Sequence, residues 1–380
     1  MGLRIVFFGT YILSDAYPVN QVLYAGVSRA AGQVWSCRAD LWDGFLHRAL
    51  HAGWGRWFRL ALRACWCYAK LIWRYMRCPE HEVVVVGYPG YIDILLARLL
   101  NLFSKRTLVL VSFISLYDTA VMDRQSVSPG SMKGRLLYAI DRCAFRCADW
   151  VLVDTQELGS HYANLFNIPR DKFRKSMVGN IFDRFPAASR ESVQAPSFRV
   201  LFFGTYVPLH GAECIVEAAR ALRHERVEFT LIGQGQDYAT VRERASGLEH
   251  VRFVETWLSA EELAEAMREA DVCLGIFGTT PKAARVIPYK VFAALALGRP
   301  VITRDSPAIR ELLVDGESAL LCPAGDGQAL AASLDRLRTD ASLRERIGRN
   351  GYARYAATAS GEAIGRDLVD QLEGAIGGGG

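Results

Sequence analysis

The chain has 380 residues, of which 51% are hydrophobic and 22% are charged. These values exclude a disordered chain, a collagen-like fibre and a small disulfide scaffold, and the length predicts two domains. The net charge of +5 is unevenly distributed. Residues 1–198 carry 24 Lys and Arg against 15 Asp and Glu, whereas residues 199–380 carry 21 against 25. The two halves are therefore expected to have different partners.

Nine cysteines are scattered along the chain without a Cys-x-x-Cys pair or a Cys/His cluster of zinc spacing. This pattern predicts reduced thiols, a cytosolic location and no structural metal. The apolar run near the N-terminus favours a first strand over a signal peptide, because no small-residue cleavage site follows it. No stretch of eighteen uncharged apolar residues occurs, so no transmembrane helix is expected.

A segment near the N-terminus is repeated in the second half. Arg4–Tyr11 reads RIVFFGTY, and 195 residues later Arg199–Tyr206 reads RVLFFGTY. Each copy is a short apolar run that ends in glycine, which is typical of a buried parallel strand opening a βα unit. Further strands, alternating with helical segments, are expected at Val83–Gly87, Leu108–Phe113, Trp150–Val153, Val227–Ile232, Val251–Val254, Val272–Phe277, Pro300–Thr303 and Ala319–Cys322.

The alternation of strands and helices predicts two doubly wound α/β domains that face a cleft. The first is expected over residues 1–185 and the second over residues 199–357, joined by a linker rich in Pro, Ser and Ala at residues 186–198. Residues 358–380 are expected to form a helix, Gly361–Ala375, that returns to the first domain, followed by a glycine tail.

A basic aromatic segment, His51–Cys78, holds six cations, no acidic residue and four of the eight Trp. On a helix the cations fall within an arc of roughly 60°, and apolar residues cover the rest. This pattern is typical of a helix lying on anionic lipid, with a core-packed helix as the alternative. Nucleic acid is disfavoured because no matching motif accompanies the stripe. The membrane candidates are Arg56, Arg59, Arg63, Lys70, Arg74, Arg77, Trp57, Trp66 and Trp73.

Two glycine turns in the second half follow predicted strands. Phe203–Gly211 leads into a predicted helix at Ala212–Leu222, and Ile232–Asp237 follows the next strand. Glycines at such turns let backbone N–H groups approach a phosphate, and a helix N-terminus favours negative charge. Neither turn has the spacing Gly-x-Gly-x-x-Gly, so a nicotinamide dinucleotide is disfavoured.

A third loop, Leu274–Lys290, precedes a predicted helix at Val291–Leu297. Its three cations, Lys282, Arg285 and Lys290, lie within nine residues at the carboxyl end of a strand. A diphosphate would need such charges. A solvated basic loop explains the same spacing equally well.

Two segments, Pro288–Ile302 (PYKVFAALALGRPVI) and Ile309–Asp326 (IRELLVDGESALLCPAGD), resemble the C-terminal signature of glycosyltransferase family 4, whose members have the GT-B fold. The resemblance covers about residues 199–357, and before them only Val178–Asp183 is similar to the family. It implies a nucleotide-sugar donor bound by the C-terminal domain, an acceptor bound mainly by the N-terminal domain, retention of configuration, and no cofactor.

The resemblance also implies roles for single residues. The turn with Gly204, Thr205, His210 and Gly211 would face the diphosphate together with Lys290, and Gly233 and Gly235 would lie near the nucleoside. The donor sugar would lie near Phe277, Gly278 and Thr279. We assign Lys282 and Arg285 to the same donor site, and we add the first copy's Gly9 and Thr10.

The chain departs from the family pattern at four positions. Thr205 and His210 stand where the family has a phosphate-binding Arg and Lys, and Ala293 stands where it has a ribose-binding glutamate. The family's other glutamate has no acidic counterpart near Gly275. A pair with the family spacing, Glu261 and Glu269, lies instead on a predicted amphipathic helix with a capping box, where we expect solvated surface. The cations of the third loop, together with His210, are expected to supply the positive field.

No Asp-x-Asp motif occurs, which favours a metal-independent transfer in which basic side chains and a helix dipole stabilise the leaving diphosphate. A diphosphate oxygen would take the acceptor's proton, with or without help from the N-terminal domain. Family members often place a His there, but Phe113–Arg124 has none. Its polar candidates for catalysis are Asp118, Asp123 and Arg124, for which helix capping and surface pairing are the alternatives.

We therefore expect a glycosyltransferase at the cytoplasmic face of a membrane, with a nucleotide-sugar donor, a lipid-linked or glycan acceptor, an anionic membrane surface and no nucleic acid as partners. A nucleotide-sugar epimerase of the same fold is one alternative, although its carboxylates or histidines cannot be located. A non-catalytic, membrane-associated homologue is the other.

Overall fold

The computed structural model describes residues 2–14, 17–41, 54–185 and 197–377, without the side chains of residues 54–60. The chain divides into two compact units. Unit 1 comprises Met1–Val121, Ser126–Val178 and Gly361–Gly380, and unit 2 comprises Met122–Gln125 and Gly179–Ser360. Most of the expected linker and the end of the glycine tail lie outside the described residues.

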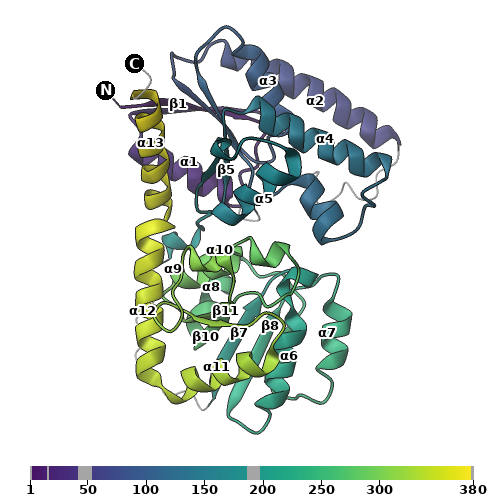
Figure 1. Cartoon of the computed structure of the whole chain (residues 1–380), viewed down its shortest axis with the longest axis vertical. Coiled ribbons are helices and arrows are strands. Elements are labelled where there is room, and N and C mark those ends of the chain that lie inside the picture. Colours follow the sequence, from purple (N-terminus) through teal and green to yellow (C-terminus); the bar gives the residue numbers. More distant parts are fainter. Residues whose placement is uncertain (1, 15–16, 42–53, 186–196, 378–380) are drawn as a thin grey trace. The chain divides into compact units, whose positions relative to one another are not determined.

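The described part of unit 1 contains a parallel six-stranded sheet in the order β2-β1-β3-β4-β5-β6 (Figure 1). The strands are β1 (Arg4–Gly9), β2 (Gln33–Arg38), β3 (Val83–Val86), β4 (Thr107–Val111), β5 (Trp150–Val153) and β6 (Phe173–Lys175). The central strands are nearly continuous apolar runs, as expected for a sheet covered on both faces. The edge strands β2 and β6 were not predicted, because β2 buries one residue of six and β6 has three residues.

Helices follow most strands of unit 1. They are α1 (Val19–Ala30), α2 (Trp54–Tyr75), α3 (Asp93–Leu100), the π-helix η2 (Asp118–Asp123), α4 (Met132–Cys147) and α5 (Gln156–Phe166). The C-terminal helix α13 (Gly361–Gly377) packs against α1 within the same unit (Figure 1). Their backbones approach so closely that a Cβ on Gly26 would collide with the Gly361 carbonyl.

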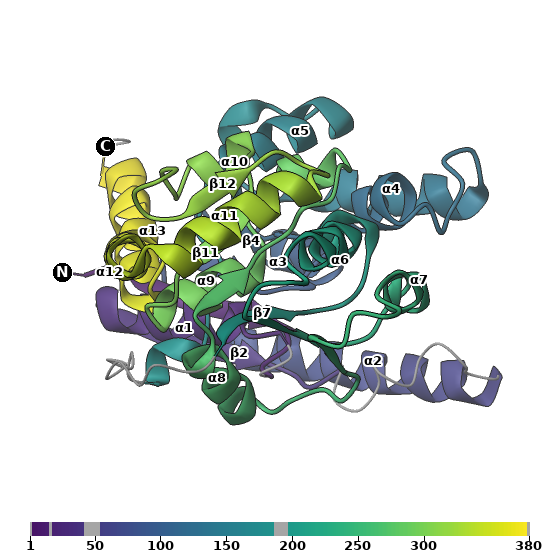
Figure 2. The same ribbon diagram turned by 90° about the horizontal axis from the view of Figure 1, so that it is seen from below.

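The described part of unit 2 has a second parallel six-stranded sheet, in the order β12-β11-β10-β7-β8-β9 (Figure 2). The strands are β7 (Phe198–Phe203), β8 (Val227–Ile232), β9 (Val251–Val254), β10 (Val272–Leu274), β11 (Val301–Arg304) and β12 (Leu320–Cys322). The helices are α6 (Ala212–Ala221), α7 (Tyr238–Arg244), α8 (Ala260–Glu269), α9 (Tyr289–Ala296), α10 (Pro307–Arg310), α11 (Gly327–Thr339) and α12 (Ala341–Thr358).

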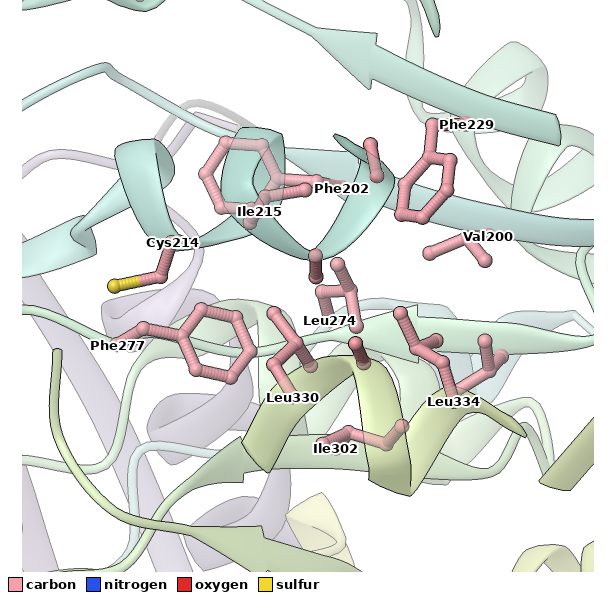
Figure 3. Close-up of a cluster of buried hydrophobic side chains, with 14 of the residues drawn as sticks. Val200, Phe202, Cys214, Ile215, Phe229, Leu274, Phe277, Ile302, Leu330 and Leu334 are labelled. Carbon is pink, nitrogen blue, oxygen red and sulfur yellow. The ribbon is translucent and has the colours of Figure 1, made fainter. Parts of the chain in front are cut away.

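One face of this sheet is closed by α6 and α11. Phe202 and Ile302 project from the sheet toward Ile215 of α6 and Leu330 of α11, and all four side chains are buried (Figure 3). This apolar layer fixes the carboxyl ends of β7 and β10, from which the candidate site is built.

Most of the predicted strand and helix boundaries lie within two residues of the observed ones, and one strand shows a longer error. The strand predicted at Val272–Phe277 ends at Leu274. At Gly275 the backbone comes so close to Thr303 that a Cβ would collide with its hydroxyl, and Ile276 N–H donates to that hydroxyl at 3.2 Å. The predicted capping box is confirmed between Ser259 and Glu262 at the start of α8.

Within the described ranges, no helix is both long and apolar enough to cross a membrane. Those ranges also hold no group of three or more His, Cys, Asp or Glu side chains arranged to hold a metal ion.

Candidate functional site

Each sheet reverses its strand order at one point, between β1 and β3 in unit 1 and between β7 and β10 in unit 2. Ligands of doubly wound sheets bind beyond the carboxyl ends of the strands at such a switch point. The repeated segment borders both points, since β1 and β7 are its two copies. The candidate ligand sites are therefore the turns after these two strands. We call the turn that begins at Gly9 the Gly9 turn, and the turn over Phe203–Gly211 the Gly204 turn.

The Gly204 turn is fastened to the loop after β10. Phe277 N–H donates to the His210 carbonyl at 2.9 Å, and Gly278 N–H donates to the Leu209 carbonyl at 3.2 Å. Gly211 precedes α6 with φ at 58°, and the Gly278 backbone leaves no room there for a Cβ. The structure thus brings four predicted residues together at the N-terminus of α6, where an anion is favoured.

The second glycine turn packs against the first. A Cβ on Gly233, whose φ is 122°, would collide with the Gly204 carbonyl, and a Cβ on Gly235 would lie 2.5 Å from the Tyr206 backbone nitrogen. These two glycines are therefore required by backbone packing, whatever they contribute to a nucleoside.

Lys290 lies at the centre of this site. It is on the first turn of α9, its residue is 5% exposed, and Nζ lies 4.0 Å from the centroid of the Phe202 ring. A Cβ on Gly204 would lie 2.8 Å from Nζ, so the ammonium group stands against the turn. Nζ has no hydrogen-bond partner in the described structure. A buried cation without a partner is costly unless an anion arrives to neutralise it.

The electrostatics of the site reflect this burial. Desolvation holds the pKa of Lys290 well below its ordinary value. Desolvation, followed by the nearby charge of Lys290, holds the pKa of His210 well below its ordinary value. Nδ1 of His210 is also buried, and none of the described residues bonds to it. An anion placed at the turn would stabilise the charged forms of both side chains.

The remaining predicted donor residues differ in their surroundings. Lys282 is buried and Arg285 is half-buried on the connection to α9, whereas Thr205 and Thr279 are exposed. The side chain of Phe277 lies in the hydrophobic core (Figure 3), so only its backbone is available to a ligand.

The sequence reasoning missed one cation at this site. Arg304 ends β11, and its guanidinium donates to the Gly278 carbonyl. Partial burial lowers the pKa of Arg304. The sequence could have pointed to Arg304 through its position at the carboxyl end of a predicted strand, which pairs with β10.

At the Gly9 turn of unit 1 the neighbouring charged side chain is an acid, Asp93, instead of a lysine. The backbone N–H and the hydroxyl of Thr10 donate to Oδ2 of Asp93, at 2.6 and 3.0 Å. The Tyr68 hydroxyl of α2 donates to Oδ1 at 2.9 Å. Asp93 is 1% exposed, and its desolvation raises its pKa against the lowering effect of these bonds. The donors of Thr10 that were predicted to face a ligand are thus engaged by an internal carboxylate.

The catalytic candidates lie on η2 and just after it: Asp118 belongs to unit 1, whereas Asp123 and Arg124 lie in the short segment Met122–Gln125 that groups with unit 2. Asp118 is fully buried, Asp123 is buried, and Arg124 is exposed. Nε2 of His161, on α5, lies 2.9 Å from Oδ1 of Asp118. The expectation that Asp118 meets a substrate directly does not fit its complete burial. His161 was missed, since it is 43 residues away in the sequence.

The basic aromatic segment forms the 22-residue helix α2. Four cations with described side chains are exposed: Arg63, Lys70, Arg74 and Arg77. Five large apolar side chains are exposed as well: Leu62, Trp66, Ile72, Trp73 and Met76. At 100° per residue these apolar positions span an arc of roughly 120°, bordered on one side by the cations. Arg56, Arg59 and Trp57 have no described side chains.

Comparisons with known proteins identify the fold and the second half. A HepE crystal structure from Anabaena, in complex with UDP, superposes with a TM-score of 0.66 at 16% identity, over 98% of this chain and all of that one. Sucrose-phosphate synthase from Thermosynechococcus elongatus gives 0.69 at 17% identity, over 99% and 100%. The protein has the GT-B fold, as predicted.

Residues 197–340 match the family model of glycosyl transferases group 1. A phosphatidyl-myo-inositol mannosyltransferase of Mycobacterium leprae is 37% identical over 41% of this chain and 42% of its own length. The amylovoran biosynthesis glycosyltransferase AmsK of Erwinia amylovora is 29% identical over 49% and 47%. The alignments thus span less than half of these curated relatives.

Proposed function

We propose that this protein is a glycosyltransferase that moves a sugar from a nucleotide-diphosphate donor to an acceptor hydroxyl. The observation that carries the proposal is the unpartnered, buried Nζ of Lys290 against the Gly204 turn. A diphosphate would stabilise the charged form of this amine and accept charge-assisted hydrogen bonds from it. The family match of residues 197–340 and the UDP bound by HepE support a nucleotide donor.

The proposed reaction retains configuration at the transferred sugar, as the resemblance to family 4 implies. The acceptor oxygen bonds to the anomeric carbon on the face from which the diphosphate departs. Lys290 and the N-terminus of α6 stabilise the charge that develops on the leaving diphosphate. Unit 1 would bind the acceptor.

An acceptor on a lipid or an envelope glycan is part of the proposal. The relatives by name act in phosphatidyl-myo-inositol mannosylation and amylovoran biosynthesis. A nucleotide-sugar epimerase would need acid–base groups beside the donor sugar. The unit 2 site instead offers cations and backbone N–H groups, so we prefer transfer.

The test is donor-induced stabilisation followed by transfer. We expect UDP-glucose or GDP-mannose to raise the melting temperature of the native protein, and the binder to transfer labelled sugar to phosphatidylinositol or a membrane lipid extract. Release of nucleotide diphosphate only with acceptor would separate transfer from epimerisation. Binding without release under any acceptor would favour the non-catalytic alternative, and no binding would contradict the proposal.

We also propose that α2 lies on an anionic membrane. Its exposed apolar arc with a cationic border suits the interface between headgroups and acyl chains. The neighbouring α3 extends this surface, because Tyr68 and Tyr75 of α2 bond to Asp93 and Asn101 on either end of α3. Leu99, Leu102 and Phe103 are exposed there. The nine unpaired cysteines support a reducing compartment, and hence the cytoplasmic face.

Vesicle flotation tests the membrane proposal with a matched control. Trp66→Glu with Trp73→Glu is expected to abolish flotation with vesicles that contain phosphatidylglycerol, because two large apolar contacts become charges. Trp257→Glu, at an exposed Trp of unit 2, should leave flotation unchanged. Equal flotation of the native protein and the double variant would contradict the proposal.

A further inference from the structure

Arg304 lies at the candidate donor site, but the proposed function gives it no role. It ends β11, and β11 pairs with β10, so Arg304 lies at the same edge of the sheet as the loop after β10. Its guanidinium donates to the Gly278 carbonyl, and Gly278 N–H donates to the Leu209 carbonyl of the Gly204 turn at 3.2 Å. All three residues belong to unit 2. A single residue thus connects Arg304 to the Gly204 turn.

The guanidinium of Arg304 is close to the N-terminus of α6. A Cβ on Gly211, which precedes α6, would collide with the Gly278 backbone nitrogen. One residue spans at most about 3.6 Å, and a hydrogen bond adds about 3 Å. The guanidinium therefore lies within roughly 10 Å of the Gly211 backbone. A sugar attached to a diphosphate at this helix N-terminus is within reach of Arg304.

None of the described residues forms an ion pair with Arg304. Its hydrogen bonds go to two backbone carbonyls, those of Gly278 and, at 3.4 Å, of Asp305. The Asp305 carboxylate instead accepts two hydrogen bonds from Arg310, at 2.6 and 2.7 Å. Arg304 is half-buried, and this desolvation lowers its pKa despite the nearby charge of Asp305. An anion that arrives from outside would stabilise the charged guanidinium.

A guanidinium suits a carboxylate better than it suits a sugar hydroxyl. It carries five N–H donors in a planar fork that matches the oxygens of a carboxylate, and the two carbonyls engage only part of them. Hydrogen bonds between two charged groups are also stronger than those to a neutral hydroxyl. Lys290 and the N-terminus of α6 are assigned to the diphosphate. A cation beyond them therefore fits a second negative charge, carried by the sugar.

We propose that Arg304 selects the donor's sugar, and that this sugar is a hexuronic acid whose carboxylate binds the guanidinium. The inference rests on the proposed function, because it places the sugar beyond the diphosphate bound by Lys290. The carboxylate serves recognition and takes no part in the transfer step. A neutral hexose in the same place leaves the cation without a counter-charge, so it binds more weakly.

Isothermal titration of the full-length protein compares matched nucleotide sugars. The pairs are UDP-glucuronate with UDP-glucose, and GDP-mannuronate with GDP-mannose. In the pair whose base binds, we expect the uronate to bind about 10- to 100-fold more tightly, the usual contribution of a hydrogen bond to a charged group. Arg304→Gln keeps an amide donor for the Gly278 carbonyl and removes the charge. It should abolish this preference and leave the affinity for UDP or GDP unchanged. Arg252→Gln, at an exposed Arg of β9, should keep the preference.

Equal affinities of the native protein for the uronate and the neutral hexose would overturn the inference and leave the proposed function intact. This comparison needs no variant, so it decides even if Arg304→Gln does not fold. An equal loss of affinity for the uronate and for the free nucleotide diphosphate in Arg304→Gln would assign Arg304 to the diphosphate and overturn the inference as well. Failure of the native protein to bind UDP, GDP or any of the four nucleotide sugars would overturn the proposed function together with this inference.

Discussion

The Gly9 turn and the Gly204 turn share the sequence Phe-Phe-Gly-Thr-Tyr but contact side chains of opposite charge. In unit 1 the backbone and hydroxyl of Thr10 bind the carboxylate of Asp93. In unit 2 the turn faces Nζ of Lys290, for which the described residues supply no hydrogen-bond partner. The same turn thus holds an internal anion in unit 1, and we propose that it receives an external anion in unit 2. The repeated motif alone therefore does not identify a ligand site, because the charge of the side chain that faces the turn determines whether an external anion is favoured there.

Removal of the Lys290 charge should have the largest effect of the changes proposed here, and the effect should be on donor affinity. Lys290→Met keeps the apolar stem against Phe202 but removes the charge. We expect the donor affinity to fall by about 2–5 kcal/mol, the usual cost of truncating one partner of a buried charge pair. Isothermal titration with the donor measures this loss. Lys133→Met, at an exposed lysine of α4, should leave the affinity unchanged, and equal affinities of all three proteins would refute the role of Lys290.

Removal of the internal anion should affect stability instead of donor binding. Asp93→Ala leaves the donors of Thr10 and Tyr68 without their acceptor. We expect the free energy of unfolding to fall by roughly 2–4 kcal/mol, since an unsatisfied buried donor costs about 1–3 kcal/mol. Urea denaturation measures this change. A loss of donor affinity as large as that of Lys290→Met would contradict the distinction between the two turns.

A side chain added at Gly204 should change stability and donor binding by less than the two substitutions above. Gly204→Ala forces a side chain onto a φ of 147° and places Cβ 2.8 Å from Lys290 Nζ. We expect a loss of roughly 1–3 kcal/mol in unfolding free energy and weaker donor binding. The control is Gly247→Ala, which also has a positive φ but no atom within 4 Å of the added Cβ. Unchanged donor binding in Gly204→Ala would show that the turn is not the site.

The pH dependence of donor binding should be the smallest effect. Burial lowers the pKa of Lys290 in the free protein, and a bound diphosphate should raise it again. The affinity should therefore be greatest below the lowered pKa of the free lysine. It should fall by at most about tenfold per pH unit until the pKa of the bound form is passed. Titration calorimetry in buffers of different ionisation enthalpy should detect proton uptake, and the Lys290→Met variant should not show it.

The sequence was most informative where a feature is local. The apolar runs of the repeated segment predicted β1 and β7, and the spacing of cations brought Lys290 into the candidate site. The helical periodicity of the basic aromatic segment predicted α2. Strand β2 was not predicted from the sequence, because an exposed edge strand has little hydrophobic pattern.

Features that depend on tertiary contacts were not predictable. Asp93 reaches Thr10 across 83 residues, and His161 reaches Asp118 across 43. No periodicity links such positions, because the order of the strands brings them together. The resemblance placed Phe277 near the donor sugar, but the residue's own hydrophobicity directs its side chain into the core.

The central claim is that the Gly204 turn with Lys290 holds the donor diphosphate. A crystal structure with the bound nucleotide sugar tests it most directly. We predict the diphosphate at the N-terminus of α6, with an oxygen within hydrogen-bond distance of Lys290 Nζ and with Asp93 still bound to Thr10. A diphosphate at the Gly9 turn in place of the Asp93 carboxylate would contradict the account, as would a donor that leaves Lys290 without a partner.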